Sequence, residues 1–415
     1  MRLSFRHTPI AALVLTFAST LGCTTSVSFG PGDTTTGAGA DPSGGGGTGG
    51  TGGVDRPAAT GAGAGGGAAT VTGAAGSATT GAGGGPVDCA GVDFATDPHH
   101  CGACGHDCLG ASCDAGMCAP IALVTEGGQP FEIALDADHV YWYNSNGTIK
   151  KISKHGGSVK TLSASNFNPA AITVFGGLVY FAQYDSWDAV KTIPVSGGAT
   201  QVIAKLDLGG TGLAVDDASI YWTSFTMWPQ KGSIMRSPRL GGAPVMLVDD
   251  AHGIQAMGVD GTHLYWSVFT DEADNPPAPG PGGLRRVPIG GGAPEVVTTS
   301  NDCSTFALDG DDVYWSYTGP GLMSGETGKI MRVAKSGGAS VEVAPAPGAA
   351  GSLAVDAGYV YFTSSVAHNV RKVPKQGGEV TVLATSNGNP YAIAVDDEAV
   401  YWVDPGNGTV NKVAK

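Results

Sequence analysis

Asp216 to Trp222 has the sequence Asp-Asp-Ala-Ser-Ile-Tyr-Trp, and this pattern, repeated along the C-terminal two-thirds of the chain, decides the fold. An aromatic pair that follows a β-branched residue or leucine occurs seven times, at intervals of 39 to 49 residues. The pairs are Tyr141-Trp142, Tyr180-Phe181, Tyr221-Trp222, Tyr265-Trp266, Tyr314-Trp315, Tyr361-Phe362 and Tyr401-Trp402. Six tyrosines have an aspartate five residues earlier, and the second copy has Phe175 there. Such periodicity indicates a repeat architecture.

Each repeat contains the signals for four short strands. A Gly-Gly pair follows the first six aromatic pairs, and short β-rich runs such as Ile149 to Ile152 and Val159 to Leu162 flank it. Glycine pairs supply the positive φ angles of tight hairpins, and the repeated aspartate suits an Asx-turn. Four strands in about 40 to 45 residues make one propeller blade. The sequence therefore predicts an all-β, seven-bladed β-propeller of four-stranded blades over residues 119–415.

The ring is predicted to close through its N-terminal strand. The seventh repeat ends at Lys415, before its own Gly-Gly pair and fourth strand. Leu123 to Pro130 matches Leu383 to Pro390, which begins at the end of the sixth repeat's fourth strand, Val380 to Leu383. A strand from about Ala119 to Thr125 should therefore complete the last blade beside Val410 to Ala414, which would remove the exposed edges of the ring.

The first 86 residues read as an export signal and a tether. Arg2 and Arg6 precede an apolar segment from Ile10 to Leu21, which is too short to span a bilayer. Gly22-Cys23 resembles the lipobox of bacterial lipoproteins, which implies a signal peptide over residues 1–22 and lipidation of Cys23. The alternative is an ordinary signal peptide with an incidental cysteine. Residues 23–86 are rich in Gly, Thr, Ala and Ser, so a disordered tether is predicted.

Residues 87–118 are predicted to form a cysteine-rich module. Its six cysteines are Cys89, Cys101, Cys104, Cys108, Cys113 and Cys118. The run from Asp97 to Cys108 resembles the small DPxxCGxCGxxC modules of secreted bacterial proteins and, more distantly, the Stig1-like domain. Three disulfides are expected because so short an exported segment has little core. Zinc binding by Cys101 and Cys104 with nearby histidines is the alternative.

Charge and motifs bear on the class of function. The net charge of −14 disfavours nucleic acid, whose phosphates an acidic surface repels. The propeller sequence contains no nucleophile elbow, zinc-protease helix or phosphate loop. Cys303 is expected to be a buried or loop thiol rather than a nucleophile. No cofactor and no metal is therefore predicted, and an enzyme is not favoured. The sequons Asn146-Gly147-Thr148 and Asn407-Gly408-Thr409 are interpreted as type I′ turns.

The candidate binding residues lie in the connections between the second and third strands of blades two to five. These connections vary most in length and carry aromatic side chains, which suit recognition on a rigid scaffold. The candidates are Trp187, Phe225, Trp228, Phe269, Asp271 and Tyr317. The alternative is that these side chains fold back over the blades as packing residues.

The run Ile220-Tyr221-Trp222-Thr223 resembles the YWTD-type and TolB-like propellers, whose scaffolds are commonly six-bladed. This resemblance implies a scaffold and not a ligand. We expect a binding module for an unknown protein, glycan or small ligand. A structural or assembly role in the envelope, or a propeller lyase or lactonase, is the alternative. Contact with the membrane is expected only through the lipid anchor. The protein is expected to be an outer-membrane lipoprotein that faces the periplasm or the cell surface.

Overall fold

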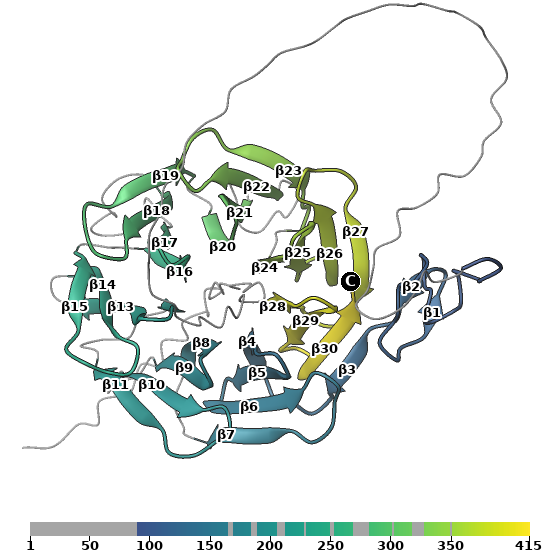
Figure 1. The fold of residues 1–415 in the computed structure, drawn as a ribbon, viewed down its shortest axis with the longest axis horizontal. Coiled ribbons are helices and arrows are strands. Elements are labelled where there is room, and N and C mark those ends of the chain that lie inside the picture. Colours follow the sequence, from purple (N-terminus) through teal and green to yellow (C-terminus); the bar gives the residue numbers. More distant parts are fainter. Residues whose placement is uncertain are drawn as a thin grey trace, which may run out of the picture. The chain divides into compact units, whose positions relative to one another are not determined.

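The computed structural model describes residues 89–164, 169–183, 189–205, 212–227, 230–249, 253–268, 282–300, 303–317, 328–348 and 351–415. The strands of the repeat region form seven antiparallel four-stranded sheets around a central axis, as predicted (Figure 1). Within these described residues there is no α-helix, and accordingly no helix long and apolar enough to cross a membrane.

The first four blades follow the chain in order. Blade 1 contains β4 (Pro130–Leu135), β5 (His139–Asn144), β6 (Thr148–Ser153) and β7 (Lys160–Ala164). Blade 2 contains β8 (Pro169–Phe175), β9 (Leu178–Gln183), β10 (Ala189–Pro194) and β11 (Gln201–Lys205). Blade 3 contains β12 (Leu213–Val215), β13 (Ser219–Met227), β14 (Gln230–Pro238) and β15 (Val245–Val248). Blade 4 contains β16 (Ile254–Val259), β17 (His263–Val268), β18 (Gly283–Pro288) and β19 (Glu295–Thr299).

The last three blades complete the ring. Blade 5 contains β20 (Cys303–Asp309), β21 (Asp312–Tyr317), β22 (Lys329–Ala334) and β23 (Val341–Pro345). Blade 6 contains β24 (Leu353–Val355), β25 (Tyr359–Ser364), β26 (Asn369–Pro374) and β27 (Thr381–Thr385). Blade 7 contains β28 (Ile393–Val395), β29 (Ala399–Asp404) and β30 (Thr409–Ala414), with β3 (Ile121–Val124) as its outer strand.

The predicted closure is confirmed. β3 pairs antiparallel with β30, Ile121 opposite Lys412 and Val124 opposite Val410, so segments from the two ends of the propeller lie side by side (Figure 1). The outer strand pair of every blade also contains a register shift at the same place. Such bulges twist a strand edge and discourage pairing with other chains.

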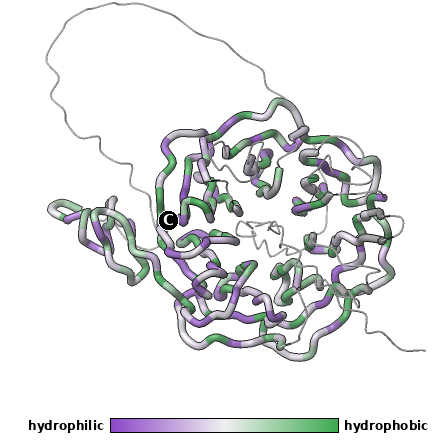
Figure 2. The backbone as a smooth tube through the Cα atoms, turned by 180° about the vertical axis from the view of Figure 1, so that it is seen from behind, coloured by the Kyte–Doolittle hydropathy of each residue, from purple (hydrophilic) through white to green (hydrophobic). Residues whose placement is uncertain are grey.

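The core consists of one hydrophobic cluster at each of the seven blade interfaces. Each cluster joins the repeated tyrosine of one blade to the tryptophan or phenylalanine of the next, as Tyr221 of blade 3 joins Trp266 of blade 4. Both residues are about 1% exposed. The second strands are therefore buried on both faces, and hydrophobic segments recur in the blades around the ring (Figure 2). This arrangement explains why they read as apolar runs rather than alternating patterns.

The turns confirm one prediction and correct another. Each Gly-Gly pair has positive φ at both positions, as at Gly156 (85°) and Gly157 (110°). The type I′ turns predicted at the two sequons are wrong. Three residues connect β5 to β6, and four connect β29 to β30. Only Gly147 and Gly408 have positive φ there, whereas a type I′ turn requires positive φ at both central residues.

The cysteine module is crosslinked as the sequence predicts. It contains the short strands β1 (Cys113–Asp114) and β2 (Met117–Cys118). Cys101 bonds Cys113, Cys108 bonds Cys118, and Cys89 and Cys104 are disulfide-bonded as well. Sulfur atoms in disulfides are not thiolate ligands, so the disulfide alternative holds over zinc binding. Cys303 is a buried thiol at the start of β20, as expected.

Candidate functional site

The repeated aspartates lie on the face of the ring that carries the first hairpin of each blade and the Gly-Gly turns. Oδ1 of Asp216 accepts the backbone N–H groups of Ala218 (2.9 Å) and Ser219 (2.7 Å), while the Tyr221 hydroxyl donates to Oδ2 (2.9 Å). The same Asx-turn occurs at Asp136, Asp260, Asp356 and Asp396. These five aspartates are therefore structural, as the sequence predicts, whereas the sixth, Asp309, ends β20 opposite Asp312.

A basic residue directly after the third strand links each of four blades to the blade before it. In three of these blades it lies two positions before the Gly-Gly turn. We call these four ion pairs the lysine belt. They are Lys154–Asp396 (2.8 Å), Lys335–Asp260 (3.0 Å), Lys415–Asp356 (2.7 Å) and Lys375–Asp309. Burial acts to raise the pKa of Asp260, but hydrogen bonds from backbone N–H groups, Thr262 and Lys335 bring that pKa well below its usual range. The four carboxylates of the belt are thus held in contacts between neighbouring blades.

Blade 2 shows why its repeat departs from the pattern. Phe175 stands where the other blades have aspartate, and the basic residue of blade 3 is Arg239. The Arg239 guanidinium lies 5.3 Å from the centre of the Phe175 ring, and its Nη1 donates to the Tyr180 hydroxyl at 3.3 Å. A cation–π contact therefore replaces the ion pair. Val195 and Ile289 replace the basic residue in blades 2 and 4 and leave the belt open there.

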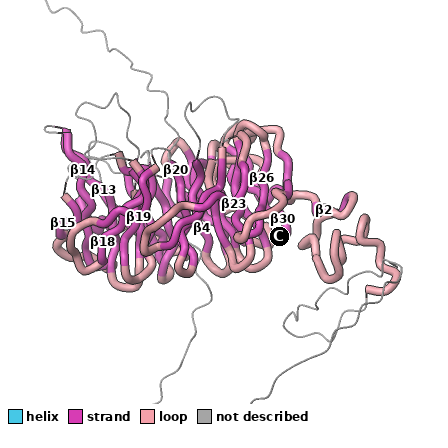
Figure 3. Tube along the Cα trace, turned by 90° about the horizontal axis from the view of Figure 1, so that it is seen from above, coloured by secondary structure: helices cyan, strands magenta, loops and turns pink. Residues whose placement is uncertain are grey.

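The opposite face carries the connections between the second and third strands and between blades. Among the described residues, blade 3 has the longest second and third strands, because β13 and β14 each have nine residues, whereas the same strands of the other blades have six. Their register continues without a shift from Ser219–Pro238 to Met227–Gln230. The tip of this hairpin projects beyond the neighbouring strands in the edge-on view (Figure 3).

Two of the six predicted site residues fall within the described part of the chain. Phe225 lies in β13 opposite Gly232, and Tyr317 ends β21, opposite Lys329. Both are at the loop-bearing face, with blade 4 between them, so they are not neighbours. The others lie outside the described residues: Trp187, Trp228, Phe269 and Asp271.

Two polar groups that the sequence analysis did not single out lie between blades. Glu132 of β4 is 5% exposed and accepts the backbone N–H of Ile172 in blade 2 at 3.1 Å. Burial raises the pKa of Glu132 to about 8, against which this single hydrogen bond acts weakly. Tyr143 lies opposite Glu132 on β5, and its pKa is also raised, first by burial and then by Glu132 and Tyr391. In the sequence, this buried site could have been recognised from the glutamate within the apolar run Pro130–Leu135.

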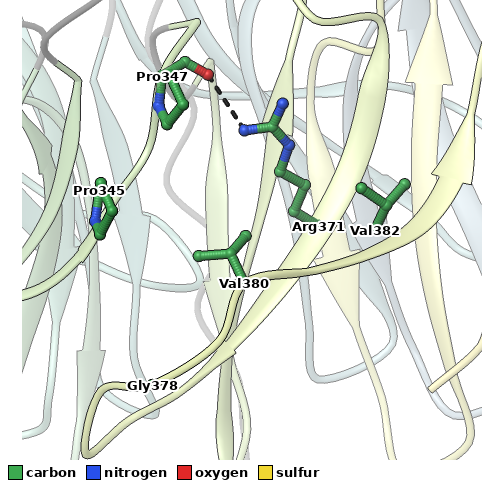
Figure 4. Close-up of a pocket in the computed structure, with 6 residues that line it drawn as sticks. All are labelled: Pro345, Pro347, Arg371, Gly378, Val380 and Val382. Atoms are coloured by element: carbon green, nitrogen blue, oxygen red, sulfur yellow. Dashed lines mark hydrogen bonds between the residues drawn. The ribbon is translucent and has the colours of Figure 1, made fainter.

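The second group is Arg371 of β26, in a groove between blades 5 and 6 (Figure 4). Its Nη1 donates to the carbonyl oxygen of Pro347 at 3.1 Å. Its Nε is buried and has no acceptor among the described residues. Burial lowers the pKa of this guanidinium, which nevertheless remains charged near neutral pH. No sequence motif marks this position, because the groove is formed by residues of two blades.

The comparisons with known proteins establish the fold and no more. No protein-family model matches the chain, and no curated protein matches it by sequence. A chain in a mitotic checkpoint complex is 12% identical, with a TM-score of 0.56 over 72% of this chain and 92% of that chain. The Kuenenia stuttgartiensis hydrazine synthase is 15% identical, with a TM-score of 0.55 over 70% of this chain and 97% of that chain.

A computationally designed protein, Ika8, is similar to this chain as well. It is 14% identical, with a TM-score of 0.53 over 71% of this chain and 98% of that chain. Identities this low show a shared architecture, and a shared fold does not by itself imply a shared activity or ligand.

Proposed function

We propose that this protein is an exported, lipid-anchored interaction module that binds a partner protein through the loop-bearing face of its propeller. The observation that carries the proposal is the β13–β14 hairpin, which extends three residue pairs beyond Ser224–Ser233 at that face. The opposite face has short turns, and its repeated carboxylates are used by the Asx-turns and the lysine belt. Recognition elements on a rigid scaffold are typically variable, projecting connections, like those on the face that carries the β13–β14 hairpin.

The proposed location rests on two independent features. Disulfides such as Cys101–Cys113 and Cys108–Cys118 persist in oxidising compartments, which supports export. The resemblance of Gly22-Cys23 to a lipobox supports a lipid anchor, and residues 24–86 supply a long connection between the anchor and the folded parts. Several acyl chains at one terminus hold a protein stably at a membrane, whereas a single chain does so marginally.

Site-specific photocrosslinking in intact cells tests the proposed face. A photoreactive residue replaces Thr226, near the tip of the β13–β14 hairpin. The control position is Leu240, which is 75% exposed in the Gly-Gly turn of the same blade, on the opposite face. We expect a discrete protein adduct from position 226 and none from position 240.

A second substitution separates binding from nonspecific proximity. Trp228→Ala changes the two-residue connection between β13 and β14 and should reduce the adduct from position 226 without lowering the melting temperature. An adduct from position 240 alone would reject the loop-bearing face. An adduct from position 226 that Trp228→Ala leaves unchanged would remove Trp228 from the contact.

A further inference from the structure

A groove on the rim of the propeller combines apolar walls with one cation. It has a volume of about 310 Å³ and lies between the outer part of blade 5 and blade 6 (Figure 4). Pro345, Pro347, Val380 and Val382 supply the walls, and Arg371 lies among them. Val382 on the outer strand β27 is 38% exposed, so the groove opens to solvent at the rim. Such walls suit a small aliphatic side chain.

The Arg371 guanidinium is held in one orientation, but not all of its N–H groups have acceptors. The bond from Nη1 to the Pro347 carbonyl holds one edge of the group, at 3.1 Å. The other edge consists of Nε and Nη2, and Nε is a buried donor without an acceptor among the described residues. An unpaired buried donor is costly to the fold and rare. The Nε/Nη2 edge is one that binds a carboxylate through two parallel hydrogen bonds.

The same face of β26 also offers an unpaired acceptor. Asn369 lies two residues before Arg371 and therefore on the same side of the strand. Its side chain is 8% exposed, and Oδ1 has no donor among the described residues. An acceptor and a donor two residues apart along one strand match the spacing of polar groups in an extended peptide.

The other blades do not repeat this arrangement. The positions that correspond to Arg371 hold Lys150, Lys191, Met235, Arg285, Met331 and Asn411. Among the described lysines and arginines, only Arg371 has a buried side-chain nitrogen without a partner. The groove is therefore a particular feature of the interface between blades 5 and 6 and not a property of the repeat.

We propose that this groove binds an extended peptide segment carrying an aspartate or glutamate beside a small apolar residue. The carboxylate accepts from the Nε/Nη2 edge of Arg371, and the apolar neighbour packs against Pro345, Val380 and Val382. This site is separate from the β13–β14 hairpin, so it stands or falls independently of the function proposed above. It adds a second contact region, at the rim.

The test follows the Nε–H signal of Arg371 by NMR in the full chain, with acetyl-Val-Asp-Val-amide as the probe. The signal is assigned by its loss in Arg371→Lys. We expect a progressive shift with a dissociation constant of about 0.1–1 mM, and at least about tenfold weaker binding of acetyl-Val-Asn-Val-amide. Arg371→Lys has no such signal, so isothermal titration calorimetry measures its binding. This variant should bind the aspartyl peptide about tenfold more weakly, because lysine lacks the two-pronged edge. Arg285→Lys, at the equivalent position of blade 4, should leave binding unchanged.

A further variant keeps the proposal testable if Arg371→Lys does not fold. Val382→Glu places a competing carboxylate at the exposed side of the groove and should also weaken the peptide about tenfold while the melting temperature is retained. No shift of the Arg371 signal with the aspartyl peptide overturns the proposal. An equal shift with sodium acetate at the same concentration overturns it too, because the site would then recognise a small anion and not a peptide.

Discussion

Lys154 Nζ lies 2.8 Å from Asp396 Oδ2, and this ion pair joins the first blade to the last. A second contact crosses the same seam, because Lys412 Nζ donates to the backbone carbonyl of Lys154 at 2.9 Å. Burial acts to raise the pKa of Asp396, but Lys154 and the N–H groups of Ala399 and Glu398 lower it overall. The lysine belt therefore continues across the point at which the ring closes.

Lys154→Met should weaken the interface between blade 7 and blade 1. The Lys154 and Asp396 side chains are 10% and 22% exposed, so their ion pair is intermediate between a surface pair and a fully buried pair. We therefore expect a loss of about 1–3 kcal/mol of unfolding free energy. Chemical denaturation measures it. Lys329→Met is the control: its pair with Glu342 is 41% and 43% exposed and screened by solvent, so the loss should be clearly smaller. Equal losses for both variants would contradict a particular role of the Lys154–Asp396 ion pair in closing the ring.

Glu132 should make the protein less stable at alkaline pH. Its pKa is about 8 in the folded protein and 4.5 as the ordinary value, so the folded state holds the proton more tightly. The contribution to stability is complete below about pH 4.5 and is lost as the pH rises to about 8, by roughly 3–5 kcal/mol. Urea denaturation from pH 5 to 9 measures this loss.

Glu132→Gln keeps the shape of the side chain but cannot ionise, so it should remove this part of the pH dependence. Glu342→Gln, at an exposed glutamate of β23, should retain it. If the two variants have the same profile as the parent protein, Glu132 does not titrate in this range.

The closing strand should be essential. Deletion of residues 119–126 removes β3 and exposes the edge of β30, which is a template for pairing with other chains. We expect aggregation and a broad thermal transition. A milder pair of variants tests the packing alone: Val124→Asp, at a buried position, should reproduce the defect, whereas Ala122→Asp, at an exposed one, should not. A truncated protein as stable as the parent would show that β3 is dispensable.

Trp222→Ala should destabilise the blade without acting on a binding surface. Trp222 is 1% exposed and packs in the cluster between blades 2 and 3. Removal of so large a buried side chain costs about 3–5 kcal/mol. Val245→Ala, at a 48% exposed position of the same blade, should change stability by less than about 0.5 kcal/mol. Calorimetry of both variants gives the comparison, and a small effect of Trp222→Ala would mean that the core tolerates the cavity.

Cys23 should carry the membrane anchor. Cys23→Ala should abolish fatty acylation and move the protein from the membrane to the soluble fraction, because no acyl chain then remains. Ser26→Ala, three residues later, should leave both unchanged. Cell fractionation and intact-mass analysis decide the matter. A soluble native protein without added lipid mass would reject the anchor.

The sequence by itself determined the features that depend on local or repeated patterns. The Asp-to-Tyr spacing predicted the Asx-turns, the Gly-Gly pairs predicted the positive φ hairpins, and the match of Leu123 to Leu383 predicted that β3 closes blade 7. Each signal lies within one repeat or recurs between repeats. The failure at Asn146-Gly147 was also local, because a three-residue connection and a two-residue turn share the same Asn-Gly signal.

Only the tertiary structure decided what depends on contacts between blades. Asp396 and Lys154 are far apart in the sequence and meet because the ring closes. The disulfide partners of Cys101 and Cys108, the buried carboxyl of Glu132 and the unpaired Nε of Arg371 likewise depend on segments that no periodicity brings together. A repeat fixes the conformation of each blade, whereas burial, charge pairing and grooves arise at the interfaces, where the side chains of neighbouring blades differ.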